Sequence, residues 1–564
     1  MTKTANPIPR IEIFQPKLVS RLREGYDLSR FRADAIAGIT VAVVALPLSM
    51  AIAIASGASP AQGLYTAIVG GFLISLLGGS SHQIGGPAGA FIVLVAATIE
   101  RHGFDGLMLA TILAGIMMLA IGMLRFGTLI RYIPEPVTIG FTAGIAVIIF
   151  ASQIRDMLGL VLAAREPAAL LPKLGVLVEA VHTFNPYAIG VALLSLGVIV
   201  GLKVSGSKFP GFLVAIIIST LVVQLFGLPV ETIGSRFGSL PTGLPMPAFP
   251  AISLARIQDV LPAALAIALL GSIESLLSAV VADGMTGRRH RSNTELIAQG
   301  VANIASALFG GVCATGTIAR TATNVRAGGQ TPVAGMLHSV FLLVAMASLA
   351  PLLVKIPLAA LGATLAFIAW NMAERHTFMA LIRSNKAEAS VLLATFLLTI
   401  FRDLIEGILV GVVLGAILFA VRMAKLAEMS GHLPALDGAK ADSVTPEGIK
   451  AGDVSVYRLD GPLFFGTAPN LQDVLARIGA SARVIIFDFK AVPLVDSSGV
   501  AALMRHLENA KARSALVIFA AVSPQIDLEL QKLGLPETRV TRAPDLASAY
   551  VLAKTYLSPD SGLG

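Results

Sequence analysis

The stretch GGVCATGTIAR, residues 310–320, places an arginine inside a long apolar region of the chain. It starts from a glycine pair, continues through small and hydroxyl side chains, and ends at Arg320. This composition indicates a short, broken helix within a membrane protein. An arginine at membrane depth is costly unless it faces a cavity or a partner, and an anion is the simplest partner. Arg320 is therefore a candidate binding residue, and the alternative is a side chain that extends to the membrane surface.

A second interrupted stretch, GGSSHQIGGPAGAF at residues 78–91, occupies a comparable place in the first half of the chain. The same Ala-Gln-Gly lead-in precedes both stretches, at residues 61–63 and at residues 298–300. Two Gly/Pro-interrupted apolar segments at corresponding positions of two halves are typical of secondary transporters built from inverted repeats. The binding site of such transporters lies near the membrane midplane, between the breaks.

The composition excludes a soluble enzyme of this size. The 564 residues are 55% hydrophobic and 13% charged, and their mean hydropathy is +0.80. These values indicate a polytopic membrane protein. The single cysteine, Cys313, allows no intramolecular disulfide and no cysteine-based metal site. The net charge of +8 is spread over the loops, so we expect no nucleic-acid partner.

Windows of about 20 apolar residues predict fourteen spans, arranged as seven plus seven. An odd number of spans in each half inverts the second half, as an inverted repeat requires. The predicted spans lie near residues 35–57, 60–78, 87–99, 106–124, 134–151, 186–203, 209–227, 258–282, 294–309, 315–325, 332–354, 357–374, 388–402 and 405–424.

Basic residues follow even numbers of crossings, which predicts that both termini lie in the cytoplasm and that the protein is a multi-pass protein of the cell membrane. The residues are Arg21, Arg23, Arg30, Arg32, Arg125, Arg131, Lys203, Lys208, Arg288, Arg289, Arg291, Arg383, Lys386, Arg422 and Lys425.

The pattern changes to soluble α/β in the last part of the chain. Strands are predicted at residues 455–459, 484–489 and 516–520, and helices at residues 468–478, 498–511, 524–533 and 544–554. The predicted organisation is a cytoplasmic N-terminal segment (1–34), a transmembrane transport domain (35–428), a linker (429–453) and a small cytoplasmic domain (454–556).

Glu274 is an acidic residue within the otherwise apolar sequence of the eighth span. Burial disfavours the charged form of a carboxylate, so Glu274 can take up and release a proton or bind a cation such as sodium. Ser278 follows one helical turn later and is expected to face the same way. The alternative is a carboxylic acid that only hydrogen-bonds a neighbouring helix.

Two half-helices are expected to point their N-terminal amides at the midplane, where the helix dipole favours an anion. One begins near Thr315, and the other follows Pro87, which suits a first helical position. Thr317 would add a hydroxyl donor and Arg320 a positive charge. The sequence contains no phosphate-binding loop and none of the common hydrolase motifs, so we expect a secondary transporter or channel rather than an enzyme.

Several motifs resemble the sulfate permease family of anion transporters, which is related to the animal sulfate-anion carriers and prestin. They are VALPLSMAIAIASG (44–57), PAQGLYTAIVGGFL (60–73), GGP (85–87), GSIESLLSAVVADGMTG (271–287) and TGTIART (315–321). The C-terminal part is similar to a STAS domain, with VDSSGVAAL at residues 495–503. The Leu48 form of the first span is similar to the sodium-dependent bicarbonate carriers.

The resemblance implies a core and a gate domain, elevator-like movement and a homodimer. It assigns Glu274 and Ser278 to the coupling cation, Arg320 to the anion, and Ala88, Gly316, Thr317 and Ile318 to the half-helix ends at the anion site. Ser498 matches a phosphorylated serine of related STAS loops, and the alternative there is a helix cap and turn.

The resulting expectation is transport of sulfate or bicarbonate driven by a proton or sodium ion, with no cofactor beyond that ion. An uncoupled anion channel or exchanger, a dicarboxylate transporter and a STAS-linked membrane sensor are the alternatives.

Overall fold

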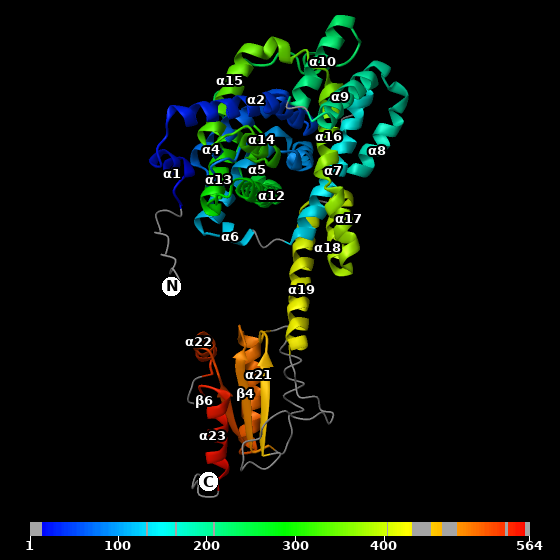
Figure 1. The fold of residues 1–564 in the computed structure, drawn as a ribbon. Helices are drawn as coiled ribbons and strands as arrows, with labels where there is room; N and C mark the ends of the chain where they lie inside the picture. Colours follow the sequence, from blue (N-terminus) through cyan, green and yellow to red (C-terminus); the bar gives the residue numbers. More distant parts are fainter. Residues whose placement is uncertain are drawn as a thin grey trace. The chain divides into compact units, whose positions relative to one another are not determined.

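The computed structural model describes residues 14–130, 134–163, 166–206, 209–402, 404–430, 453–464, 482–535 and 540–558. These residues belong to two compact units, Met1–Gly415 and Ala416–Gly564. The first unit is almost entirely helical, and the second contains a parallel β-sheet with helices (Figure 1). The predicted helix at residues 468–478 and most of the predicted linker lie outside the described residues.

Each of the fourteen predicted spans contains helix. The segments are α2 (Leu28–Ala55), the continuous run of α3 (Pro60–Tyr65), a π-helical turn (Thr66–Gly70) and α4 (Gly71–Leu77), α5 (Ile92–Met123), α7 (Glu135–Leu158), α9 (Pro186–Val204), α10 (Gly211–Phe226), α12 (Leu254–Thr286), α13 (Ser292–Leu308), α14 (Ile318–Arg326), α15 (Val333–Leu353), α16 (Leu358–Met372), α18 (Lys386–Phe401) and α19 (Leu404–Ser430).

Two of the predicted spans lie in α5. They are separated by a kink at Gly103, whose φ of 69° is not helical. By length and composition alone, eight helices of the described part qualify as membrane spans. The sequence did not predict five short helices in the connections, which are α1 (Lys17–Arg23), α6 (Gly127–Ile130), α8 (Leu170–Glu179), α11 (Ile233–Phe237) and α17 (Arg375–Ser384).

The helices of the first unit form two bundles (Figure 1). The core bundle consists of α2–α5 and α12–α15, and the gate bundle of α7, α9, α10, α16, α18 and the beginning of α19. Each half of the chain therefore contributes its first four predicted spans to the core bundle and its last three to the gate bundle, among the described residues. This division is the arrangement that a seven-plus-seven repeat predicts.

Glycines let the gate helices approach one another closely. A Cβ atom at Gly140 would lie 2.5 Å from the carbonyl oxygen of Leu392, and one at Gly411 would lie 2.3 Å from Thr395 Oγ1. Both neighbours are on α18, which thus packs between α7 and α19. The glycines are spaced four residues apart, at Gly140 and Gly144 on α7 and at Gly407, Gly411 and Gly415 on α19, and they serve packing within one subunit. Such small residues are usual at helix contacts in membranes, where the hydrophobic effect does not drive helices together.

The second unit has a four-stranded parallel sheet in the order β3 (Val454–Asp460), β4 (Val484–Ala491), β5 (Leu516–Ala520) and β6 (Thr541–Ala543). Two helices, α21 (Ser497–Ala512) and α22 (Pro524–Lys532), pack on one face of the sheet, and α23 (Leu546–Leu557) packs on the other. The three predicted strands are present, as are the helices predicted at residues 498–511, 524–533 and 544–554. The short strand β6 was not predicted.

Candidate anion-binding site

The two interrupted stretches meet inside the core bundle. They form a small antiparallel pair of strands, β1 (Gly85–Gly86) and β2 (Thr315–Gly316), in which Gly85 lies opposite Gly316 and Gly86 opposite Thr315. The amide of Thr317 extends the pairing by donating to the carbonyl of Ile84 at 3.0 Å. Segments more than 200 residues apart in the chain are thereby fixed side by side.

The half-helices begin later than the sequence predicts. Thr315 belongs to β2, and α14 starts at Ile318 with Thr317 as its N-cap residue. In the first half, Ala88 is the N-cap of a 3₁₀ turn, Gly89–Phe91, that continues into α5. Pro87 therefore precedes the cap instead of occupying the first helical position. In the second half the strand pairing holds Thr315 and Gly316 in extended conformation, and in the first half Ala88, two residues after β1, is still extended.

Backbone amides at these two helix starts are available to a ligand. The first turn of a helix contains N–H groups without intrahelical acceptors, and the helix dipole adds positive potential there. Thr317 and Ala88 make no side-chain cap hydrogen bond. Ala88 and Thr317 are buried, whereas the side chain of Ile318 is 42% exposed and marks the open side of the site. An anion is the ligand such a pair of helix starts favours.

Arg320 lies inside the core bundle and is only 2% exposed. Its Nη2 donates to Ser49 Oγ of α2 at 3.1 Å and to the carbonyl of Pro87 at 3.3 Å. Its Nε and Nη1 atoms are buried and have no hydrogen-bond partner among the described residues. The side chain therefore does not extend to the membrane surface. A buried guanidinium with two unused donors leaves room for an anionic acceptor.

The position of the Arg320 guanidinium leaves no space for a side chain at residue 86. A Cβ atom at Gly86 would lie 2.1 Å from Arg320 Nη1, much closer than two non-bonded atoms can approach. Gly316 is constrained in the same way, because a Cβ there would lie 1.7 Å from Gln83 Nε2. The two glycines of the strand pair thus let polar side chains reach the point where the breaks meet.

Glu274 lies on α12, and this helix packs against β2 and α14. Its Oε2 atom is buried without a hydrogen-bond partner among the described residues, so no hydrogen bond to a neighbouring helix occupies it. Within those residues no three His, Cys, Asp or Glu side chains come together as a metal site.

Ser278 connects α12 to the second half-helix. Its Oγ donates to Thr321 Oγ1 at 3.1 Å, and the same Thr321 oxygen accepts from the amide of Ile84 at 3.1 Å. One turn earlier, Ser275 Oγ accepts from Gln83 Nε2 at 2.8 Å. The helix that contains Glu274 is thus hydrogen-bonded to both broken segments, which provides a physical route for coupling between a cation and an anion.

Four residues that support the site were not singled out from the sequence: Ser49, Thr66, Gln83 and Asn303. Asn303 pairs with both the N–H and the carbonyl of Ala314, at 2.9 and 2.8 Å, and Thr66 Oγ1 accepts from the amide of Val312 at 2.7 Å. These bonds satisfy backbone groups that the irregular segment would otherwise bury unpaired. A polar side chain within an apolar span is the sequence feature that could have identified Ser49, Thr66 and Asn303, whereas Gln83 lies in the first interrupted stretch.

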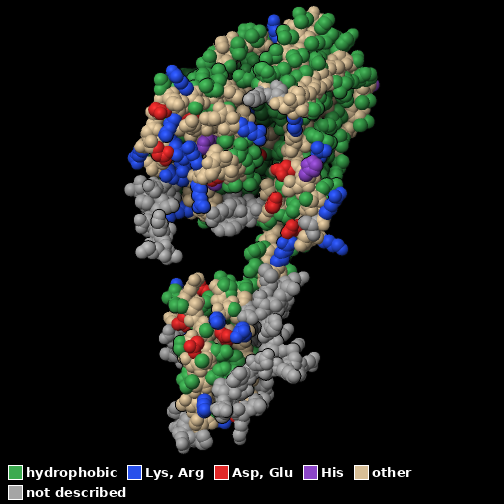
Figure 2. All heavy atoms as spheres, in the orientation of Figure 1, with side chains coloured by type: hydrophobic (Ala, Val, Ile, Leu, Met, Phe, Trp, Pro, Cys, Tyr) green, Lys and Arg blue, Asp and Glu red, His purple; other side chains and the backbone are tan. Residues whose placement is uncertain are grey.

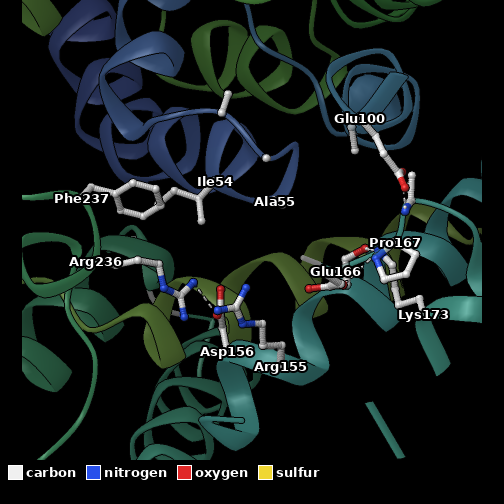
Figure 3. A pocket seen from close by; sticks show the side chains of 15 residues that line it. Ile54, Ala55, Glu100, Arg155, Asp156, Glu166, Pro167, Lys173, Arg236 and Phe237 are labelled. Carbon is white, nitrogen blue, oxygen red and sulfur yellow. Dashed lines mark hydrogen bonds and ion pairs between the residues drawn. The ribbon is translucent and has the colours of Figure 1, made fainter. Parts of the chain in front are cut away.

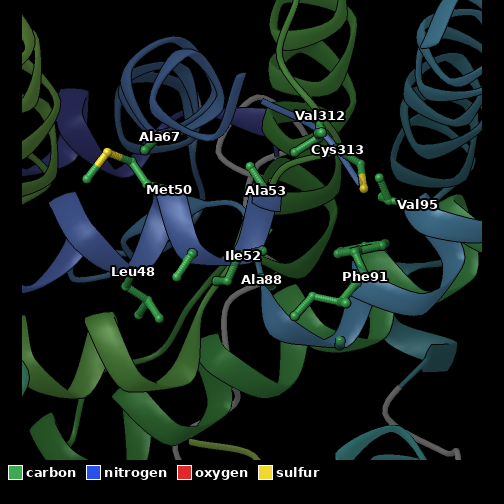
Figure 4. Packing of buried hydrophobic residues seen from close by; sticks show 14 of the residues in the cluster. Leu48, Met50, Ile52, Ala53, Ala67, Ala88, Phe91, Val95, Val312 and Cys313 are labelled. Carbon is green, nitrogen blue, oxygen red and sulfur yellow. The ribbon is translucent and has the colours of Figure 1, made fainter. Parts of the chain in front are cut away.

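Apolar side chains fill the space around the first half-helix start. Figure 4 shows Ala88 next to Ile52 of α2, with Leu48 farther along the same helix and Phe91 on the side of Val95 and Cys313 of the second break. All six belong to one buried cluster. This packing makes the surroundings of the helix starts poor in water, and electrostatic attraction between helix dipoles, Arg320 and an anion is stronger there than in water.

A separate polar pocket of about 220 Å³ lies between the core and gate bundles (Figure 3). Charged side chains line its gate side, where Arg236 pairs with Asp156 at 2.8 Å and Lys173 with Glu166 at 3.1 Å. From the core side, Glu100 of α5 accepts a hydrogen bond from the amide of Ala168 at 3.0 Å. This bond directly connects the two bundles.

In the second unit, Ser498 stands at the start of α21. The N-cap of that helix is Asp496, whose Oδ1 accepts from the amides of Ser498 and Gly499 at 2.9 Å each. The carboxylate thus makes the capping bonds, and the serine hydroxyl is not needed for them. The turn is structural in the described state, and phosphorylation of Ser498 stays a prediction.

The family model described as "Sulfate permease family" matches residues 31–395, and the model described as "STAS domain" matches residues 445–549. The chain belongs to the sulfate permease family. The match covers more than half of the sequence and includes both broken segments. The relatives in this family are named as transporters, so the chain belongs to a family of anion transporters.

Relatives in the sulfate permease family agree with this assignment. The putative sulfate transporter YvdB of Bacillus subtilis is 40% identical over 91% of this chain and 95% of its own length. The bicarbonate transporter BicA of Synechocystis is 31% identical over 94% of this chain and 96% of its own.

A solved structure shows the same fold as this member of the sulfate permease family. The murine Slc26a9 anion transporter in the inward-facing state has a TM-score of 0.83 and 18% identity, and the match covers 98% of this chain and 96% of that one. At this identity the likeness concerns the fold alone.

Proposed function

We propose that this protein is a secondary active transporter of a small inorganic anion, sulfate or bicarbonate, across the cell membrane. Relatives named for each of the two anions cover nearly the whole chain, which supports this pair of substrates. Both termini lie in the cytoplasm in this proposal, since the basic residues follow even numbers of crossings.

The meeting of the two broken segments is the observation on which the proposal rests. The anion binds between the half-helix starts at Ala88 and at Gly316–Ile318, and accepts hydrogen bonds from their free amides and from Arg320. Binding at this point satisfies the unused Nε and Nη1 donors of the arginine. Without an anion these buried donors stay unpaired, which is unfavourable.

Glu274 couples the anion to a cation. When it binds a proton or sodium ion, a negative charge near the anion is neutralised, so each ion favours binding of the other. The hydrogen bonds of Ser278 and Ser275 connect this helix to both breaks. A cation driven inward by its gradient thereby drives anion entry.

Movement of the core bundle relative to the gate bundle exposes the site to each side in turn. The anion contacts belong entirely to the core bundle, so this bundle can move as a unit with its ligand, as an elevator mechanism requires. The protein functions as a homodimer in this proposal, as the family resemblance implies.

Uptake into proteoliposomes tests the function. Labelled sulfate and labelled bicarbonate are offered separately, each with an inward proton gradient, an inward sodium gradient or no gradient. The proposal expects accumulation of one of the two anions that depends on one of the two cations. Accumulation of neither anion would refute the proposed substrates, and equal uptake with and without gradients would indicate an uncoupled exchanger or channel.

A further inference from the structure

Basic side chains crowd around the N-terminal helix α1. Lys17 and Arg21 belong to α1, and Arg288 and Arg291 belong to the connection between α12 and α13. All four are half-buried. Figure 2 shows Lys and Arg side chains gathered over α1. These four residues are called the basic cluster below.

The basic cluster is held mainly by uncharged acceptors. Arg291 Nη1 donates to the carbonyl of Gln15 at 2.8 Å and to Ser20 Oγ at 3.0 Å. Arg288 Nη1 donates to the carbonyl of Gln330 at 2.9 Å, and Arg21 Nε donates to Ser81 Oγ at 3.0 Å.

The acidic groups near the basic cluster already have partners, one of them within the cluster. Glu24 pairs with Arg21, whereas Asp283 accepts from His290, and Asp34 accepts from Thr331 and its neighbouring amide. Among the described residues, Lys17, Arg288 and Arg291 have no ion-pair partner. The cluster therefore contains uncompensated positive charge.

Burial and the neighbouring cations both disfavour the charged forms of Lys17 and Arg288. Burial, together with the Arg291 and Arg21 cations, holds the pKa of Lys17 below its usual range. Burial and the nearby Arg21 likewise lower the pKa of Arg288. An anionic ligand would stabilise the charged forms of such crowded, partly desolvated cations.

Exposed apolar side chains follow Lys17 and Arg21 in the sequence. Leu22, Leu28 and Phe31 are 48%, 64% and 42% exposed, at the end of α1 and the start of α2. A segment with exposed apolar residues next to basic ones is typical of chain that lies in the headgroup region of a membrane. This pairing of features favours a lipid over a free ion, because a free ion would gain nothing from the apolar residues.

The basic cluster is also bonded to the first broken segment. Arg21 bonds Ser81, the amide of Lys17 donates to the carbonyl of Gly78, and the amide of Arg291 donates to the carbonyl of Gly79. Gly78–Ser81 lead into β1, which carries the anion site's strand pairing. A ligand bound to the basic cluster would therefore also hold the backbone of residues 78–81, which leads into the strand pair of the candidate site.

We propose that the basic cluster binds the phosphate headgroup of an anionic phospholipid, whose acyl chains contact Leu22, Leu28 and Phe31. The lipid neutralises the crowded cations and fixes α1 against the first broken segment. It thus stabilises the core bundle in the region that precedes the anion site.

The test uses the purified full-length protein in detergent and requires no transport. Thermal unfolding is followed during titration with phosphatidylglycerol, phosphatidylcholine or inorganic phosphate, and the affinity is taken from the concentration dependence of the midpoint. The variant is Lys17→Gln with Arg288→Gln. The control is Arg383→Gln with Lys386→Gln, which removes two cations from the region of α17 and α18.

Phosphatidylglycerol is expected to stabilise the wild-type protein. Its affinity for the double variant is expected to be roughly thirtyfold lower, because each cation removed near an anionic lipid lowers the affinity about fivefold. The control keeps the wild-type affinity. Arg288→Gln alone, a milder change, is expected to lose about fivefold. Equal effects of phosphatidylcholine, or an equal loss in the control, would overturn the proposal.

Stabilisation by inorganic phosphate at the same concentrations would assign the cluster to a free anion and overturn the lipid assignment. Since the measurement involves no uptake, failure of lipid binding and failure of anion transport are distinguishable.

Discussion

Arg320 of α14 donates from Nη2 to Ser49 Oγ of α2 at 3.1 Å, and so connects the second half-helix to the first span. The same nitrogen also reaches the carbonyl of Pro87, at the first break. One side chain of α14 therefore bonds two other parts of the core bundle, α2 and the first break, while its Nε and Nη1 atoms stay unused. This combination distinguishes Arg320 from a surface arginine.

Arg320→Gln is expected to raise the KM for the transported anion at least about tenfold, because a hydrogen bond to a charged partner contributes about 1.5–3 kcal/mol. Arg326→Gln, at the exposed end of the same helix, is the control and should leave the KM unchanged. Anion uptake into proteoliposomes measures both. Equal effects of the two changes would show that Arg320 has no special part in binding.

Gly86→Ala is expected to abolish uptake, because the added Cβ would lie 2.1 Å from Arg320 Nη1 and must displace the guanidinium. Gly89→Ala is the matched control, since its Cβ would meet only Ile149 Cδ1 at an ordinary 3.6 Å. Size-exclusion chromatography checks that both variants are folded. A folded Gly86→Ala protein with wild-type uptake would contradict the site described here.

Glu274→Gln is expected to remove the dependence of uptake on the cation gradient, because the amide cannot bind a proton or sodium ion as the carboxylate does. Glu406→Gln provides the control, since that glutamate pairs with Arg402 at an exposed position. Uptake is measured with and without proton and sodium gradients. Unchanged dependence on both cations would rule out the coupling role of Glu274.

Glu100→Ala is expected to open the pocket between the two bundles more often, because it removes the acceptor for the Ala168 amide. A cysteine introduced at Ala96, which lines the pocket, would react with an impermeant maleimide about fivefold faster, the factor for an exposed bond of about 1 kcal/mol. The background is Cys313→Ser, which removes the buried native cysteine. The control is Asp105→Ala, which should leave the labelling rate unaltered.

The cap of α23 is expected to weaken in acid. The amide of Ser548 donates to Asp545 Oδ1 at 2.7 Å, and this bond lowers the pKa of the Asp545 carboxyl from its usual 3.8. A lowered pKa in the folded state adds stability at pH values above about 4 that disappears as the pH falls through the lowered pKa. Asp545→Ala should therefore speed hydrogen exchange at the start of α23 near neutral pH.

The difference between Asp545→Ala and the wild type should shrink as the labelling pH is lowered towards the pKa of the folded carboxyl. Hydrogen exchange of the full-length protein, followed by mass spectrometry of α23 peptides, measures it. Peptides from α22 serve as the internal control. A difference that is constant with pH would mean that the charge of Asp545 does not contribute to the cap.

The outline of the fold could be predicted because apolar length and loop charge are local properties of the chain. The same is true of the two breaks, whose glycines and proline cannot continue a regular helix. Arg320 and Glu274 were identifiable because a charged side chain within an apolar span is energetically costly and usually has a function. Helix starts were placed wrongly at Thr315 and Pro87, since pairing between the breaks is not visible in either stretch alone.

By itself, the sequence determined that the chain crosses a membrane repeatedly, that it is interrupted twice at matching positions, and that an arginine and a glutamate lie within its apolar part. Only the tertiary structure decided that the two breaks pair with each other and that Ser49 and Pro87 hold Arg320. It also decided that Ser278 bonds Thr321 and that α1 is tied to the first break. The physical reason is that hydrophobic burial is encoded residue by residue, whereas a hydrogen bond between distant segments exists only after the helices have packed.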